Sequence, residues 1–140
     1  MNIFVVDASV GLKWFVPEIH SQSAMKLRTT AHQLHVPGLF DVEIGNILWK
    51  KIRRGELLPA EAEAILEQLA NLPITRHADA PLVRSAFDIA HESQRTVYDC
   101  LYVALAMRLG GELITADERL LNSLAGSTWG NSIRFVENLP

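Results

Sequence analysis

Short apolar runs alternate along the chain with segments in which apolar residues recur every three or four positions. Runs rich in β-branched and aromatic residues predict buried strands, and a spacing of three to four predicts amphipathic helices. The predicted strands are residues 3–6, 34–36, 74–76, 112–115 and 133–136. The predicted helices are a short one entered through residues 7–9 and longer ones at 20–32, 39–54, 59–70, 80–93, 97–109 and 117–124. Strands that alternate with helices indicate an α/β fold with a parallel sheet covered on both faces.

Three aspartates interrupt this apolar pattern. Asp7 ends the run IFVV, Asp117 follows LITA, and Asp99 is the only charge in TVYDCLYVALAM. Ionised aspartate is rarely buried without a partner or a metal. In parallel sheets, ligands bind beyond the carboxyl ends of the strands, where Asp7 and Asp117 are expected to lie. If the Asp99 helix packs nearby, the three acids converge at one end of the fold and predict a metal site.

Each acid also has a purely structural interpretation. Asp7 and Asp117 would serve as N-caps of the helices that follow them, and Asp99 stands at the third helical position after a possible Thr96 cap. Glu43 lies one position off the apolar stripe of its helix and shares a side with Asn46, so it suits either a site or a solvated face. Asp41 is a candidate N-cap of the same helix and a weaker ligand candidate.

Composition narrows the class of protein. With 140 residues, of which 49% are hydrophobic and 21% charged, the chain is expected to form one globular domain over residues 1–140. No stretch approaches the ~20 apolar residues of a membrane span. The start MNIFVVDASV lacks a basic leader, and the single cysteine, Cys100, fits a reducing compartment, so we expect a cytoplasmic protein. The net charge of -3 gives no overall attraction to nucleic acid, although Lys50, Lys51, Arg53 and Arg54 form a local basic run.

Four stretches together resemble a known family. VVDASVGLKWFVPE, DVEIGNIL, YDCLYVALAMRLG and LITADERLL match, in order and approximate spacing, the acidic motifs of PIN-domain ribonucleases. The chain is most similar to the VapC-type toxins of bacterial and archaeal toxin–antitoxin operons, over residues 3–136. The resemblance implies a three-layer α/β/α sandwich with a short parallel sheet.

The resemblance also implies roles for individual residues. It assigns Asp7, Glu43, Asp99 and Asp117 to an acidic catalytic pocket, in which the three aspartates hold Mg²⁺ or Mn²⁺. Polar positions beside these acids match supporting residues of the family, here Ser9, Asn46 and Thr115. Independently of the resemblance, the basic residues near the motifs are candidates either for RNA phosphate contacts or for a solvated surface, namely Lys13, Arg95 and Arg119. The implied activity is a toxin endoribonuclease that cleaves single-stranded or structured RNA, forms a homodimer and pairs with a small antitoxin.

Three other functions remain open on the sequence. A PIN-like housekeeping nuclease would use the same residues outside a toxin operon. A phosphatase with Asp7 as covalent nucleophile would need a second aspartate two positions later, where Ser9 stands. In a non-catalytic binding module the acids would only cap helices, and Mn²⁺ would not stabilise the protein.

Overall fold

A single parallel sheet forms the centre of the molecule. The computed structural model describes residues 2–29 and 31–140. The strands are β1 (Asn2–Val6), β2 (His32–Pro37), β3 (Thr75–His77), β4 (Glu112–Thr115) and β5 (Ile133–Phe135). Their order is β3-β2-β1-β4-β5, and every neighbouring pair is parallel. The chain fills one side of β1 before it crosses to the other, so the strand order switches between β1 and β4. Ligand sites of open α/β sheets lie at such a switch point.

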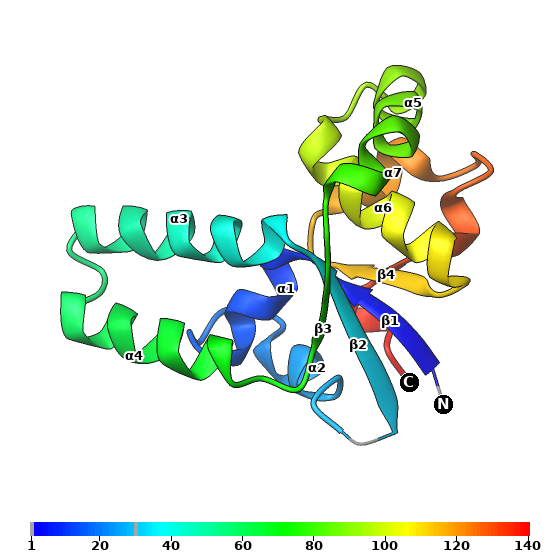
Figure 1. The fold of residues 1–140 in the computed structure, drawn as a ribbon. Coiled ribbons are helices and arrows are strands. Elements are labelled where there is room, and N and C mark those ends of the chain that lie inside the picture. Colours follow the sequence, from blue (N-terminus) through cyan, green and yellow to red (C-terminus); the bar gives the residue numbers. More distant parts are fainter. Residues whose placement is uncertain (1, 30) are drawn as a thin grey trace.

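Helices cover both faces of this sheet, as the sequence predicts. They are α1 (Ala8–Gly11), α2 (Ser21–Met25), α3 (Leu39–Arg53), α4 (Pro59–Ala70), α5 (Val83–Ser93), α6 (Val97–Leu109) and α7 (Glu118–Leu124). Helix α6 packs on β1, β2 and β4, and α5 covers α6. Helices α1 and α2 lie on the opposite side, and α3 and α4 pack together as a pair that projects from the sheet (Figure 1). The result is the predicted three-layer α/β/α arrangement. None of the helices described is long and apolar enough to cross a membrane.

Helix α6 is the buried centre of one layer. Its residues from Cys100 to Ala106 are all at most 5% exposed, because the helix lies between the sheet and α5. A helix that is apolar on every side is expected to be buried on every side. Thr96 begins the helix by accepting a hydrogen bond from the Asp99 backbone nitrogen at 3.1 Å, and Gly110 ends it with a φ of 66°. Asp99 therefore lies in the first turn of a rigid, buried element.

The ends of β1 and β4 place two further acids at the sheet edge. Val5 and Val6 of β1 and Leu113 and Ile114 of β4 are fully buried, and the backbone nitrogen of Asp7 donates to the carbonyl of Ile114. The two strands therefore end side by side. Asp7, the residue after β1, and Asp117, two residues after β4, therefore emerge at the same edge of the sheet.

Two predicted helices differ from those in the structure. The helix expected at 20–32 ends at Met25, and β2 begins at His32, which lies opposite Asn2 in the sheet; Thr30 lies outside the described residues. The β-branched Thr29 and the pairing of β2 with β1 oppose a longer helix. In the 80–93 segment, α5 begins at Val83 after a 3-10 turn. Two apolar residues of this helix, Val83 and Phe87, are 45% and 58% exposed.

Candidate active site

Asp7 is held by three hydrogen-bond donors at the end of β1. Its Oδ1 accepts from the Val10 backbone nitrogen at 3.2 Å and from the Ser9 hydroxyl at 2.5 Å. Its Oδ2 accepts from the Thr115 hydroxyl. The residue is only 7% exposed. Burial raises the pKa of Asp7 to about 6 in spite of these donors, and the negative charge of Asp117 adds to the rise. A cation beside this carboxylate would therefore be strongly favoured.

Asp117 combines a helix cap with a side chain that faces the pocket. Its Oδ1 accepts from the backbone nitrogens of Arg119 at 2.9 Å and Leu120 at 3.2 Å, and so caps α7. Its own backbone nitrogen donates to the Thr115 hydroxyl at 3.0 Å. Thr115 thus connects the two aspartates, since it also donates to Asp7. The capping interpretation of Asp7 and Asp117 is correct, and it leaves each with a carboxylate oxygen that meets a pocket residue.

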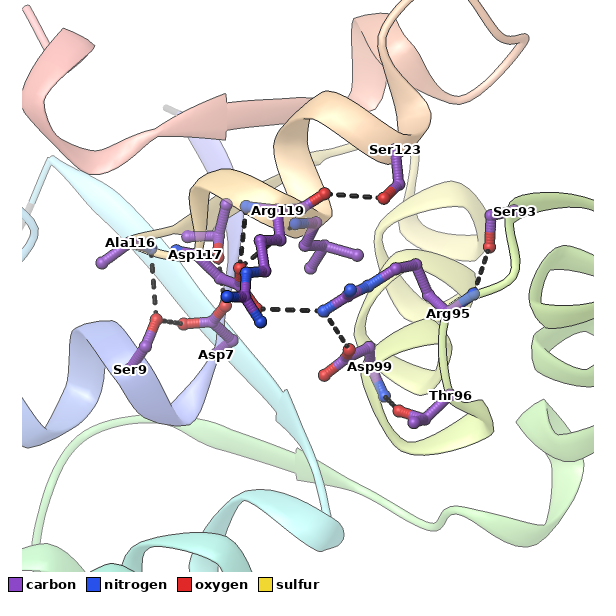
Figure 2. A network of polar contacts seen from close by, with 12 residues as sticks. Asp7, Ser9, Ser93, Arg95, Thr96, Asp99, Ala116, Asp117, Arg119 and Ser123 are labelled. Atoms are coloured by element: carbon purple, nitrogen blue, oxygen red, sulfur yellow. Dashed lines mark hydrogen bonds and ion pairs between the residues drawn. The ribbon is translucent and has the colours of Figure 1, made fainter.

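Asp99 faces Asp117 across the pocket, and Arg95 lies between them. One guanidinium nitrogen of Arg95, Nη2, is 3.2 Å from Oδ2 of Asp99 and 3.4 Å from Oδ2 of Asp117 (Figure 2). Burial raises the pKa of Asp99, and the positive charge of Arg95 opposes that rise. The sequence predicts Arg95 only as a candidate phosphate contact or a solvated residue. Its position four residues before Asp99 was the signal that could have indicated this ion pair.

Glu43 belongs to the same pocket and not to a solvated face. It lies near the start of α3, and its Oε1 accepts a hydrogen bond of 2.5 Å from the hydroxyl of Tyr102 on α6. Burial raises the pKa of Glu43, the Tyr102 hydroxyl opposes the rise, and the charge of Asp99 adds to it. Tyr102 was missed from the sequence, although its spacing of three residues from Asp99 puts both on neighbouring positions of one helix.

Of the other predicted site residues, only Arg119 lies at this pocket. Lys13 is only 8% exposed, and its ammonium is 3.3 Å from Glu18, so it is not a solvated surface residue; its contact with an RNA phosphate stays a prediction. Asn46 is exposed on α3, while Arg119 is exposed and lies at the pocket in Figure 2. Asp41 is not an N-cap: Gly38 has that position, and Asp41 instead pairs with Arg76 at 2.6 Å.

The pocket has the donor chemistry of a divalent-cation site. Carboxylate and hydroxyl oxygens are the ligands that Mg²⁺ prefers, usually one or two carboxylates completed by water and phosphate. Within residues 2–29 and 31–140, however, no three His, Cys, Asp or Glu side chains are close enough together to hold one ion. Asp99 and Asp117 are spaced around the Arg95 nitrogen at 3.2 and 3.4 Å, whereas Mg²⁺ needs oxygens at about 2.1 Å. The oxygen ligands of this pocket therefore suit a divalent ion chemically. To coordinate it, the carboxylates of Asp99 and Asp117 would have to move closer together.

Comparisons with known proteins agree with this architecture. The family model of the PIN domain matches residues 4–126. Ribonuclease VapC3 of Pyrobaculum aerophilum is 41% identical over 118 residues, which cover 83% of this chain and 90% of that protein. Ribonuclease VapC3 of Mycobacterium tuberculosis is 36% identical over 116 residues, which cover 83% of each chain.

Solved structures show the same fold. The crystal structure of PAE2754 from Pyrobaculum aerophilum superposes with a TM-score of 0.71 at 29% identity, over 97% of this chain and 85% of that one. A toxin–antitoxin complex from Klebsiella pneumoniae superposes with a TM-score of 0.63 at 13% identity, over 97% of this chain and 98% of that one, and shows the fold alone. The motif order, the parallel sheet and the matched residues together establish that this chain belongs to the PIN domain family.

Proposed function

We propose that this chain is a VapC-type endoribonuclease, the toxin of a toxin–antitoxin pair, and that it hydrolyses RNA at the acidic pocket with Mg²⁺ or Mn²⁺. The relatives named Ribonuclease VapC3 cover most of this chain and most of their own length, which supports the activity. The observation that carries the proposal is the arrangement of the pocket. Asp7, Asp99 and Asp117 come from three separate elements, and Asp117 is near enough to both other aspartates for its charge to raise their pKa values. Glu43 lies near Asp99, whose charge raises the pKa of Glu43.

Asp7, Asp99 and Asp117 would hold the ion, which supplies positive charge to the phosphate oxygens and makes a water molecule more acidic. The hydroxyls of Ser9 and Thr115 each fix one oxygen of Asp7, so that carboxylate is oriented before any ligand arrives. Such orientation matters because a hard cation tolerates little error in ligand geometry.

Glu43 is the side chain best suited to take a proton from the attacking water. A general base works well when its pKa lies near the working pH, and burial moves the pKa of Glu43 upward, toward that range. Tyr102 donates to Oε1 of Glu43 and so orients the carboxylate. Arg119, exposed at the rim of the pocket, would contact a phosphate of the RNA.

The partners follow from the same assignment. We propose a small antitoxin that covers the acidic pocket, a homodimer, and a cytoplasmic location for a single PIN-like domain over residues 1–140. Large apolar side chains stand exposed on two helices that an antitoxin or a second copy would cover. They are Val42 and Trp49 on α3, at 67% and 52%, and Val83 and Phe87 on α5, at 45% and 58%.

A non-catalytic binding module is the second candidate, because Asp7 and Asp117 do cap α1 and α7. A phosphatase with Asp7 as nucleophile is disfavoured, since Ser9 and Val10 both donate to Oδ1 and Thr115 donates to Oδ2.

Cleavage assays distinguish the candidate functions. The purified protein is incubated with single-stranded RNA in Mg²⁺, in Mn²⁺ or in EDTA. The proposal predicts internal cleavage with either metal and none in EDTA, together with a melting temperature that rises with Mn²⁺. Cleavage that persists in EDTA would refute the metal requirement. If the protein does not cleave RNA and its melting temperature does not change with Mn²⁺, the binding module is favoured.

A further inference from the structure

Arg95 is the only side chain described that forms ion pairs with two acids of the pocket at once. A single nitrogen, Nη2, lies within 3.4 Å of one oxygen from Asp99 and one from Asp117. These two carboxylates belong to α6 and to the start of α7, so the guanidinium links two elements that are distant in sequence (Figure 2). A positive charge between two carboxylates occupies the kind of position that a bound cation takes.

The guanidinium is not fully bonded where it lies. Its Nε is buried and has no hydrogen-bond partner among the residues that the structure describes. A buried donor without a partner is unfavourable, so this position of the side chain does not satisfy all its donors. Both carboxylates are bonded through Nη2 alone, which differs from the two-nitrogen fork that gives strong arginine–carboxylate pairs.

The backbone of Arg95 is held in place by hydrogen bonds on both sides of it. The preceding Gln94 ends α5 in the left-handed region with a φ of 61°, and its side chain donates to the carbonyl of His91 at 2.8 Å. The backbone nitrogen of Arg95 donates to the Ser93 hydroxyl at 3.3 Å, and Thr96 caps α6. Withdrawal of the guanidinium would therefore need only rotation of the Arg95 side chain, without a change in either helix.

We propose that the Arg95 guanidinium and the divalent ion are alternative occupants of one position between Asp99 and Asp117. Arg95 is then an internal counter-ion: it neutralises the acids of the metal-free pocket, and it must withdraw before an ion binds. This inference rests on the proposed metal-dependent function and adds to it a residue that controls metal affinity.

Charge and distance explain why both cannot be present. A guanidinium and a divalent ion a few ångströms apart repel strongly in a half-buried site, where water screens less than in bulk. The two carboxylates also need to close from more than 3 Å around nitrogen to about 2.1 Å around Mg²⁺, and Arg95 holds them at the wider spacing. Removal of the Arg95 charge should therefore strengthen metal binding, the opposite of what the loss of a metal-supporting residue would do.

Mn²⁺ binding to the full chain, measured by calorimetry and by the electron paramagnetic resonance signal of the free ion, tests this inference. The test variant is Arg95→Met, which keeps the length of the side chain and removes its charge. The matched control is Arg84→Met on α5, since Arg84 also pairs with an aspartate four residues later, Asp88, but outside the pocket. We expect the Kd of Arg95→Met for Mn²⁺ to fall by about tenfold or more, and that of the control to stay within about twofold of wild type.

A second readout is stability without metal. In EDTA, Arg95→Met should melt below wild type because two acids lose their counter-ion, and on Mn²⁺ addition its melting temperature should rise by more than that of wild type. If Arg95→Met does not fold, Arg95→Gln removes the same charge and keeps a donor for the carboxylates, and its Kd should also fall.

The outcomes separate this inference from the function on which it rests. If the folded charge-removal variant binds Mn²⁺ with an unchanged or higher Kd, the counter-ion role of Arg95 is refuted. Mn²⁺ binding by wild type would still support the metal site itself. Absence of Mn²⁺ binding by both proteins refutes the metal site and the counter-ion together.

Discussion

Replacement of Asp7 by asparagine should stabilise the metal-free protein at neutral pH. Burial raises the pKa of Asp7 from 3.8 to about 6, so the folded state favours the protonated carboxyl. A raised folded-state pKa contributes stability that is complete below pH 3.8 and is lost as pH rises through about 6. At pH 8 the ionised carboxylate therefore costs folding about 3 kcal/mol, from roughly two pKa units at 1.36 kcal/mol each.

Asparagine avoids that cost and has a smaller one of its own. Its amide nitrogen would meet the Thr115 hydroxyl that now donates to Asp7, and re-pairing this buried hydroxyl costs about 1 kcal/mol. The net gain at pH 8 is about 2 kcal/mol, which corresponds to a rise of about 8 °C in melting temperature for a chain of this size. At pH 4 Asp7 is protonated in the folded wild type, so only the cost of re-pairing remains and Asp7→Asn should be about as stable as wild type or slightly less stable.

Thermal melts of wild type and Asp7→Asn in EDTA, from pH 4 to pH 8, measure this difference. The matched control is Asp88→Asn, an exposed carboxylate on α5 that pairs with Arg84 at 3.5 Å. Its melting temperature should stay within about 2 °C of wild type at every pH, since exposed pairs contribute little. A difference between Asp7→Asn and wild type that does not grow between pH 4 and pH 8 would refute the reasoning about burial.

Three further predictions concern Tyr102, Gly111 and Gly45. Tyr102→Phe removes the donor to Glu43, so the pKa of Glu43 should rise further and the pH at which RNA cleavage reaches half its maximum should shift upward; an unchanged pH–rate profile would exclude Glu43 as the base. Gly111→Ala should destabilise the fold by about 1–3 kcal/mol, because its Cβ would collide with the backbone carbonyl of Ile3. Gly45→Ala, where the new methyl meets nothing within 4 Å, should instead stabilise α3 by about 0.5–1 kcal/mol in denaturant titrations.

The parts of the fold that follow from local pattern were predictable. Apolar runs gave β1 and β4, and the dense apolar segment after Thr96 gave the buried helix α6. The helix predicted at 20–32 was too long because the pairing of β2 with β1, a contact distant in sequence, overrides the helical preference of the segment before it. Phe87 on α5 shows a different limit. Helical periodicity does not reveal which apolar side chains remain exposed once the helix packs on its neighbours.

In the candidate site, too, the features that depend on local sequence were predictable and those that depend on tertiary contacts were not. The sequence pattern and the family motifs together place Asp7, Asp99 and Asp117 at one edge, because strand ends and a helix start determine their positions. Arg95 and Tyr102 were not given their structural roles, since their side chains reach the pocket through tertiary contacts. The sequence predicts Lys13 as a phosphate contact or a solvated residue, whereas its burial beside Glu18 depends on how the segment after β1 packs.

Asp99 allows the most direct test of the pocket as the site of metal-dependent RNA cleavage. Asp99→Asn keeps the shape of the side chain and removes the charge that a metal requires. The cap of α6 is unaffected, because Thr96 accepts from the backbone nitrogen of Asp99. Asp88→Asn on α5 makes the same chemical change outside the pocket.

The measurement is single-stranded RNA cleavage by wild type, Asp99→Asn and Asp88→Asn in Mg²⁺ or Mn²⁺, alongside melts that establish folding. We expect Asp99→Asn to fold, to bind Mn²⁺ more weakly and to lose cleavage, while Asp88→Asn cleaves as wild type does. Cleavage at the wild-type rate by well-folded Asp99→Asn would contradict the assignment of the acidic pocket as the metal-dependent active site.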